Sequence, residues 1–121
     1  MNSSTGEFNL RPMDESEFIR LAEELLQELD RRMETSGIDA DCRFKGAGVL
    51  EIEFGDGSRI IVNSQAAVRE IWVAAKSGGY HFRRDGTRWV NTRDGGELFA
   101  AVSDHASRQS GEAVDLAAPG D

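Results

Sequence analysis

Cysteine, proline and long apolar runs are scarce in this chain of 121 residues. The single cysteine, Cys42, has no partner for an internal disulfide, which is typical of proteins from a reducing compartment. No apolar stretch approaches the roughly 18 residues that a membrane-spanning helix needs. The N-terminus also lacks the basic start and apolar run of a secretory signal. We therefore expect a cytoplasmic protein without a membrane partner.

Positive charge is also scarce, because 14 Lys and Arg face 22 Asp and Glu, for a net charge of −8. Residues 13–41 hold ten acids and three arginines, whereas residues 43–93 hold nine bases and five acids. Residues 94–121 are acidic again, with six acids and one arginine. An acidic surface repels phosphate backbones, so we expect no nucleic-acid partner. Cations or a basic protein surface are the partners that this charge favours.

The length allows one domain with a single core. Residues 1–12 are polar and have little to bury, so we expect a disordered leader, and Met13 is a candidate natural start. We expect one folded domain over 13–116 and a frayed tail over 117–121, which includes Pro119 and Gly120.

An amphipathic helix is predicted over about residues 15–35. Asp14 followed by Glu17 resembles a capping box at its start, and Gly37 is a plausible stop. The apolar stripe, with spacings of three and four, consists of Phe18, Leu21, Ala22, Leu25, Leu29 and Met33.

The middle of the chain predicts four or five short strands in an antiparallel meander. Leu50, Ile52 and Phe54 alternate with acids, which is typical of a half-buried strand. Glycine-containing turns are expected at 55–57 and 85–86, and Gly78-Gly79 is expected to break the third apolar run. The remaining apolar segments are 59–63, 71–74, 80–83 and 88–90.

A second helical stretch follows residues 94–97, with a buried side made of Leu98, Phe99, Ala101, Val102 and Ala106. Both helices need an apolar surface to cover. The sequence therefore predicts an α+β two-layer sandwich, with the N- and C-terminal helices packed on one face of an antiparallel sheet. The other face would be open to solvent or a partner.

Several segments of the middle of the chain form a distinctive set: Phe44-Lys45-Gly46-Ala47-Gly48-Val49-Leu50, Asn63-Ser64-Gln65, Ile71-Trp72-Val73-Ala74, Gly78-Gly79-Tyr80-His81-Phe82 and Trp89. These segments resemble the frataxin family, most closely its bacterial branch. Their order and spacing together are more specific than any one of them. The resemblance extends over about 13–116 and has the same helix–sheet–helix order.

The resemblance implies iron binding (Fe²⁺ or Fe³⁺) on acidic surface of the first helix and first strand. It also implies docking on the cysteine desulfurase and iron–sulfur scaffold complex, as a regulator of cluster assembly rather than an enzyme. We expect a monomer, with metal-dependent oligomers as an alternative.

Carboxylates on the first helix and the following strand are the candidate iron ligands, because oxygen donors suit hard cations. The interpretation as ordinary solvated charge stays open. The loop at 35–39 is less acidic than in many relatives and Arg31-Arg32 intrudes, so we expect weak binding. The candidates are Glu23, Glu24, Glu28, Asp30, Glu34, Asp39 and Asp41.

Cys42, His81 and His105 are the other potential ligand or catalytic side chains. Cys42 is a ligand or reactive thiol in one interpretation and a core residue in the favoured one. His81 is expected on the sheet face opposite to Tyr80 and Phe82, in a structural or solvent-facing role. His105 lies in the second helix and is given no role.

Asn63, Gln65 and Trp72 are the candidate protein-binding residues on the open face of the sheet. An outward Trp beside amides is a typical partner anchor, with large area and a hydrogen-bond donor. The alternative is that Trp72 packs under a loop. Four basic residues are candidates to frame this face, although each alone is equally well interpreted as solvated charge: Arg69, Lys76, Arg83 and Arg84.

Two functions remain open on the sequence: an iron-binding regulator of cluster assembly, and a protein-binding adaptor whose acids only steer association. A small enzyme is a third hypothesis. Nothing in the sequence resembles a Ser–His–Asp arrangement, a phosphate loop or a paired-His metal site.

Overall fold

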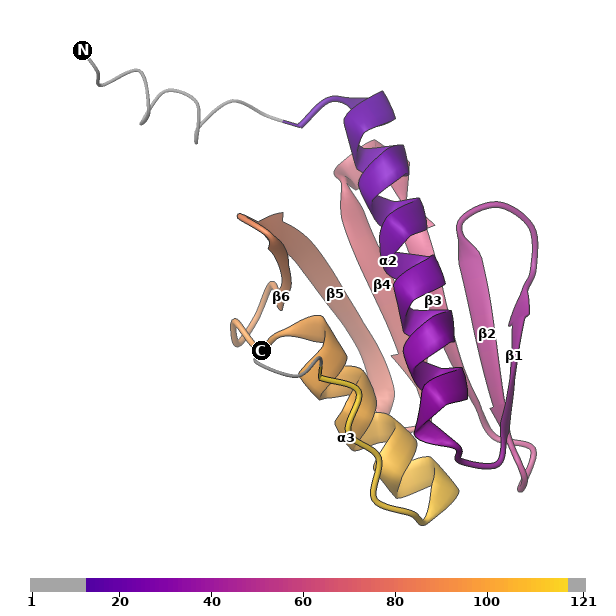
Figure 1. The fold of residues 1–121 in the computed structure, drawn as a ribbon. Helices are drawn as coiled ribbons and strands as arrows, with labels where there is room; N and C mark the ends of the chain where they lie inside the picture. Colours follow the sequence, from indigo (N-terminus) through magenta and orange to yellow (C-terminus); the bar gives the residue numbers. More distant parts are fainter. Residues whose placement is uncertain (1–12, 118–121) are drawn as a thin grey trace.

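The computed structural model describes residues 13–117 (Figure 1). The predicted leader 1–12 and residues 118–121 of the predicted tail lie outside the described residues. In the described part, no helix has the length and apolar character needed to cross a membrane. The elements are α2 (Glu15–Ser36), β1 (Ala40–Phe44), β2 (Val49–Phe54), β3 (Arg59–Gln65), η1 (Ala66–Val68), β4 (Glu70–Ala75), β5 (Gly78–Asp85), β6 (Arg88–Asn91) and α3 (Leu98–Ser110).

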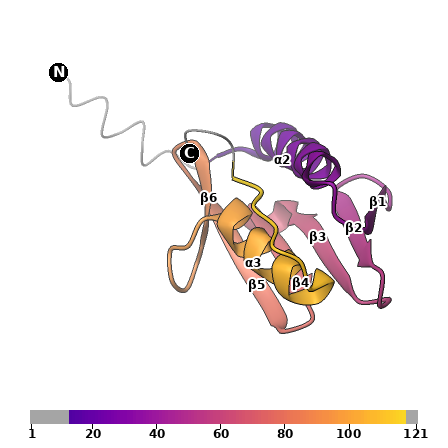
Figure 2. The same ribbon diagram turned by 60° about the horizontal axis from the view of Figure 1, so that its bottom comes forward.

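The six strands form one sheet in the order β1-β2-β3-β4-β5-β6, with every neighbouring pair antiparallel. Both helices pack on the same face of this meander (Figure 2). The predicted α+β sandwich is therefore confirmed. The strand count exceeds the predicted four or five, because β1 is an edge strand whose residues are at most half-buried, which leaves only a weak apolar alternation.

Helix α2 begins and ends as the sequence predicts. The Asp14 carboxylate accepts a hydrogen bond from the Glu17 amide at 2.8 Å, which satisfies one of the free donors of the first turn. Gly37 adopts φ 76°, a left-handed conformation that favours glycine, and its amide bonds the carbonyl of Glu34 at 3.3 Å.

A single apolar core lies between the helices and the sheet. Phe18 of α2 contacts Trp89 of β6 edge-on, with ring centroids 5.9 Å apart. Val114 and Leu116 extend this core beyond α3, and the Leu116 amide donates to Ser103 Oγ at 2.8 Å. The fully buried large side chains include Phe18, Leu26, Leu29, Leu50, Ile52, Ile60, Val62, Ile71, Val73, Phe82 and Leu98.

The predicted break at Gly78-Gly79 is wrong, because both glycines lie within β5. Gly78 pairs with Ala75 and Gly79 with Ala74, and the turn lies two residues earlier, at Lys76 and Ser77. Hydrogen bonding to the neighbouring strand thus outweighs the weak strand preference of glycine.

Candidate functional site

The predicted iron ligands on α2 differ in their surroundings. Glu23 and Glu24 are exposed near the start of the helix, where Arg20 pairs with Glu24 at 3.2 Å. Glu23 lies beside the β1–β2 turn, in a shallow hollow that Phe44 and Gly46 also line. An exposed pair such as Arg20–Glu24 is worth at most about 1 kcal/mol, so Glu24 stays available to a cation.

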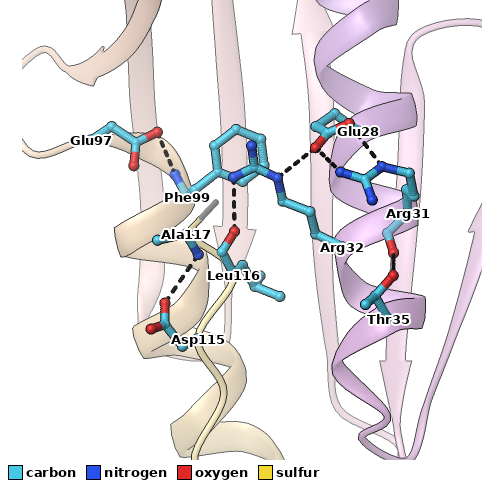
Figure 3. Close-up of polar contacts among 9 residues, drawn as sticks. All are labelled: Glu28, Arg31, Arg32, Thr35, Glu97, Phe99, Asp115, Leu116 and Ala117. Atoms are coloured by element: carbon cyan, nitrogen blue, oxygen red, sulfur yellow. Dashed lines mark hydrogen bonds and ion pairs between the residues drawn. The ribbon is translucent and has the colours of Figure 1, made fainter. Parts of the chain in front are cut away.

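Glu28 is held by two arginines rather than being free on the surface (Figure 3). Arg31 bonds both of its carboxylate oxygens, and Arg32 Nε donates to Oε2 at 2.7 Å. These hydrogen bonds, first from Arg31 and then from Arg32, lower the pKa of Glu28 to about 2. To bind a metal ion as predicted, Glu28 would therefore have to lose its hydrogen bonds to Arg31 and Arg32.

Arg32 connects this carboxylate to the C-terminal segment. Its Nη1 donates to the carbonyl of Leu116 at 2.8 Å, and its guanidinium lies 3.9 Å from the centroid of the Phe99 ring (Figure 3). The Arg32 side chain is only 15% exposed. Glu28 and Arg32 thus belong to the structure that joins α2, α3 and the C-terminal segment.

A second group of acids surrounds Cys42 where the end of α2 passes β1. The Cys42 pKa rises to about 11, chiefly because the thiol is partly buried and then because of the negative charges of Asp30, Asp41 and Glu34. Cys42 packs against the core, which agrees with its interpretation as a core residue, although it is only half-buried. The thiol therefore stays protonated at neutral pH and is a poor metal ligand there.

Asp39 and Asp41 complete this group, which we name the acidic edge: Asp30, Glu34, Asp39 and Asp41. Asp41 lies 3.9 Å from Arg43, a long contact between two exposed side chains. Within residues 13–117, no ion pair involves Asp30, Glu34 or Asp39. The acidic edge thus carries charge that the described part of the protein leaves largely uncompensated.

The donor chemistry of the acidic edge suits iron, but its geometry does not form a ready chelate. Among the described residues, no group of three or more His, Cys, Asp or Glu side chains is arranged to hold a metal ion. Exposed carboxylates on a helix end and an edge strand would have to move together around a cation. This arrangement is suited to weak binding.

The open face of the sheet carries the predicted protein-binding residues. Strand pairing places Asn63 opposite Trp72 and Gln65 opposite Glu70, on the face away from the helices. Trp72 is half-buried, and its ring stacks on His81 with centroids 4.4 Å and planes 9° apart. Trp72 therefore lies on the open face, as predicted, and His81 lies there too.

Glu70 is a residue of this face that the sequence analysis missed. It is only 8% exposed, and its two oxygens accept from Trp72 Nε1 at 2.8 Å and Arg83 Nε at 2.9 Å. His81 Nδ1 lies 3.5 Å from Glu70 Oε1. Burial opposes ionisation, but the two hydrogen bonds and the charges of Arg83 and His81 outweigh it, so the pKa of Glu70 is lowered. We name Asn63, Gln65, Glu70, Trp72, His81 and Arg83 the docking face.

Of the four basic residues expected to frame the docking face, Arg83 lies within it. Arg84 points to the helix side, 5.3 Å from the Trp89 ring centroid, since successive strand residues face opposite ways. Arg69 bonds the carbonyls of Met13 and Ala66, beside the start of α2. Lys76 lies in the β4–β5 turn and its amide bonds Gln109 of α3. The prediction is therefore wrong for Arg69 and Arg84.

The sequence assigns His105 no role, and the structure places this residue against the core. It is 8% exposed and its ring lies 4.7 Å from that of Tyr80. Burial lowers the pKa of its imidazole, so it stays neutral at physiological pH.

Comparison with known proteins identifies the family of this fold. A family model described as a frataxin-like domain matches residues 11–112. The chain belongs to the frataxin family. An iron–sulfur cluster assembly protein CyaY from Cupriavidus metallidurans is 52% identical over 108 residues, which span 87% of this chain and 97% of that protein. The CyaY of a Janthinobacterium species is 55% identical over 109 residues, 86% of this chain and 96% of that protein.

Solved structures of frataxins have the same architecture. Frataxin from Psychromonas ingrahamii superposes with a TM-score of 0.81 and 32% identity, over 88% of this chain and all of that one. Trimeric yeast frataxin, solved in complex with ferrous iron, gives a TM-score of 0.61 at 20% identity, over 93% of this chain. The yeast likeness shows the shared fold alone.

Proposed function

We propose that this frataxin-family protein is a cytoplasmic, iron-binding regulator of iron–sulfur cluster assembly that docks on the cysteine desulfurase and scaffold complex. Its role is binding and restraint rather than catalysis of its own. The CyaY relatives, named for cluster assembly and about half identical over nearly their whole length, support the pathway.

The observation that carries the iron part is the uncompensated charge of the acidic edge. Carboxylates without basic partners lower the free energy of a nearby cation. Burial is the main cause of the raised pKa of Cys42, and the negative charges of Asp30, Asp41 and Glu34 add to it. The lack of a prearranged chelate in the described part favours weak, exchangeable binding. A protein that senses or passes on iron needs that exchange.

The two surfaces divide the proposed work. The acidic edge attracts Fe²⁺ and a basic patch on the desulfurase, because long-range charge steers encounter. The docking face makes the close contact through Trp72, Asn63 and Gln65. Helix α2, which carries Asp30 and Glu34, packs on the sheet that carries the docking face, so one folded domain presents both surfaces together.

Anaerobic titration of Fe²⁺ against backbone amide NMR signals tests the iron part. We expect selective broadening from Asp30 to Asp41 at sub-millimolar metal, and its loss in a Glu34→Gln/Asp39→Asn/Asp41→Asn variant. A matched control, Glu15→Gln/Asp85→Asn/Glu112→Gln, removes the same charge from exposed sites elsewhere and should broaden like the wild type. No broadening below millimolar metal would instead favour the adaptor without functional iron binding.

Pull-down with the organism's own cysteine desulfurase tests docking with the same two variants. We expect the acidic-edge variant to lose most binding at low salt, and the control variant to keep it. Equal losses in both would mean that overall charge, rather than this surface, attracts the desulfurase.

A further inference from the structure

The docking face contains a feature that defines what kind of surface it fits. The only polar atom of the Trp72 ring is its indole Nε1, and that atom already donates to Glu70 at 2.8 Å. An indole usually offers a partner both apolar area and this N–H. Here the donor is used inside the protein.

The rest of the indole is defined by its neighbours. His81 covers one face of the ring, at 4.4 Å and nearly parallel. Since Nε1 faces Glu70 and one ring face is covered, the surface that Trp72 leaves exposed consists of carbon atoms. The surrounding rim is polar, because the Arg83 and His81 side chains are 65% and 48% exposed.

The surroundings of Glu70 hold its carboxylate in place as an acceptor for the indole N–H. Its second oxygen is held by Arg83 at 2.9 Å, so the carboxylate is fixed from both sides and stays ionised. A buried N–H without an acceptor costs about 1–3 kcal/mol. By supplying the acceptor in advance, Glu70 removes that cost when a partner covers the indole.

We propose that Trp72 enters an apolar pocket of the protein partner by its carbon edge, and that Glu70 is the positioning residue that makes this docking favourable by holding the indole N–H. The pocket is apolar and offers the indole no acceptor, and its rim carries hydrogen-bond acceptors that meet the exposed Arg83 side chain. This inference rests on the proposed docking to the desulfurase and scaffold complex.

Binding of the full-length protein to that complex, measured by calorimetry, distinguishes an apolar anchor from a donating one. Trp72→Phe keeps an aromatic edge and lacks the N–H, so it should weaken binding less than about threefold, whereas Trp72→Ala should weaken it at least about tenfold. Equal losses in the two variants would overturn the inference while leaving the proposed function standing. A wild-type protein that does not bind the complex would reject the proposed function and, with it, the docking of Trp72.

Variants of Glu70 test the positioning role. Glu70→Ala should weaken binding about tenfold because the indole N–H loses its acceptor, and Glu70→Gln, whose amide oxygen can accept, should restore most of it. Glu112→Ala is the matched control, because it removes an exposed glutamate away from the docking face and should leave binding unchanged. In a Trp72→Phe background, Glu70→Ala should cost nothing further, and an undiminished cost there would show that Glu70 acts by another route.

A measurement on the free protein checks the hydrogen bond itself. The Trp72 indole N–H signal should shift and exchange faster with water in Glu70→Ala, while the signal of the core Trp89 stays in place as an internal reference. An unchanged Trp72 signal would overturn the inference whatever the binding data show.

Discussion

The acidic edge and the docking face are both polar surfaces, yet they are organised in opposite ways. On the docking face, one buried carboxylate, Glu70, is bonded by Trp72 and Arg83. On the acidic edge, Asp30, Glu34 and Asp39 have no basic partner within the described residues. One surface has its charges satisfied before any partner arrives, and the other leaves them exposed.

This difference shows how one small fold can serve two kinds of recognition. A preorganised surface loses little entropy on docking and suits a defined protein contact. An uncompensated surface attracts cations and basic patches over a distance and adapts to them. The candidate iron ligands on α2 are therefore divided in the structure, with Glu28 bonded by two arginines and Glu34 exposed to solvent.

The largest expected effect comes from Arg32, which makes Glu28 part of the folded structure whereas Glu34 stays exposed. Arg32→Ala removes bonds to Glu28 and to the Leu116 carbonyl and the contact with Phe99, so we expect a loss of about 2 kcal/mol of unfolding free energy. Arg31→Ala is the matched control, since Arg31 bonds the same Glu28 carboxylate but is 63% exposed, and it should cost less than about 1 kcal/mol. Urea denaturation measures both. Equal losses would mean that Arg32 has no role beyond the surface pair.

Most of the fold follows from local patterns in the sequence. The spacing from Phe18 to Met33 predicts α2, and the alternation from Leu50 to Phe54 predicts β2, because a buried face imposes its period on the residues. The pairing of Gly78-Gly79 within β5 could not be predicted, since it depends on β4 beside it. The seating of Leu116 against Ser103 is likewise a contact between distant segments.

The candidate site is less predictable, because charges are compensated in three dimensions. The pairing of Glu28 was available in part from its spacing to Arg31 and Arg32, which suits helix ion pairs. Glu70 also left a signal, since it stands two residues before Trp72 and therefore on the same face of a strand. The direction of Arg84 follows from the same alternation. The identity of the unpaired acids depends on contacts between distant segments, so it could not be predicted without the fold.

The pH dependence of stability should separate paired from unpaired carboxylates. The pKa of Glu28 is near 2 in the folded protein and about 4.5 when unpaired, so the unfolded chain binds a proton first as the pH falls. The contribution of Glu28 is therefore complete above pH 4.5 and is lost as the pH falls from about 4.5 to about 2. Glu28→Gln should flatten the fall in melting temperature over that window, and Glu34→Gln, which removes an exposed acid, should not. A wild-type slope in Glu28→Gln would show that its arginine pairs contribute nothing.

The smallest expected effect is a change in the alkylation rate of Cys42, which reports cation binding at the acidic edge. Burial, and then the negative charges of Asp30, Asp41 and Glu34, raise the pKa of Cys42 to about 11. A cation held by these carboxylates should therefore lower the pKa. Mn²⁺, which prefers oxygen ligands, should then speed alkylation of Cys42 by iodoacetamide at pH 8 about two- to threefold, as a shift of a few tenths of a pKa unit implies. Asp30→Asn/Glu34→Gln should react faster without metal and respond little to it. A wild-type rate that Mn²⁺ leaves unchanged would mean that the cation binds elsewhere, and the contrast between the two surfaces would then lose its functional meaning.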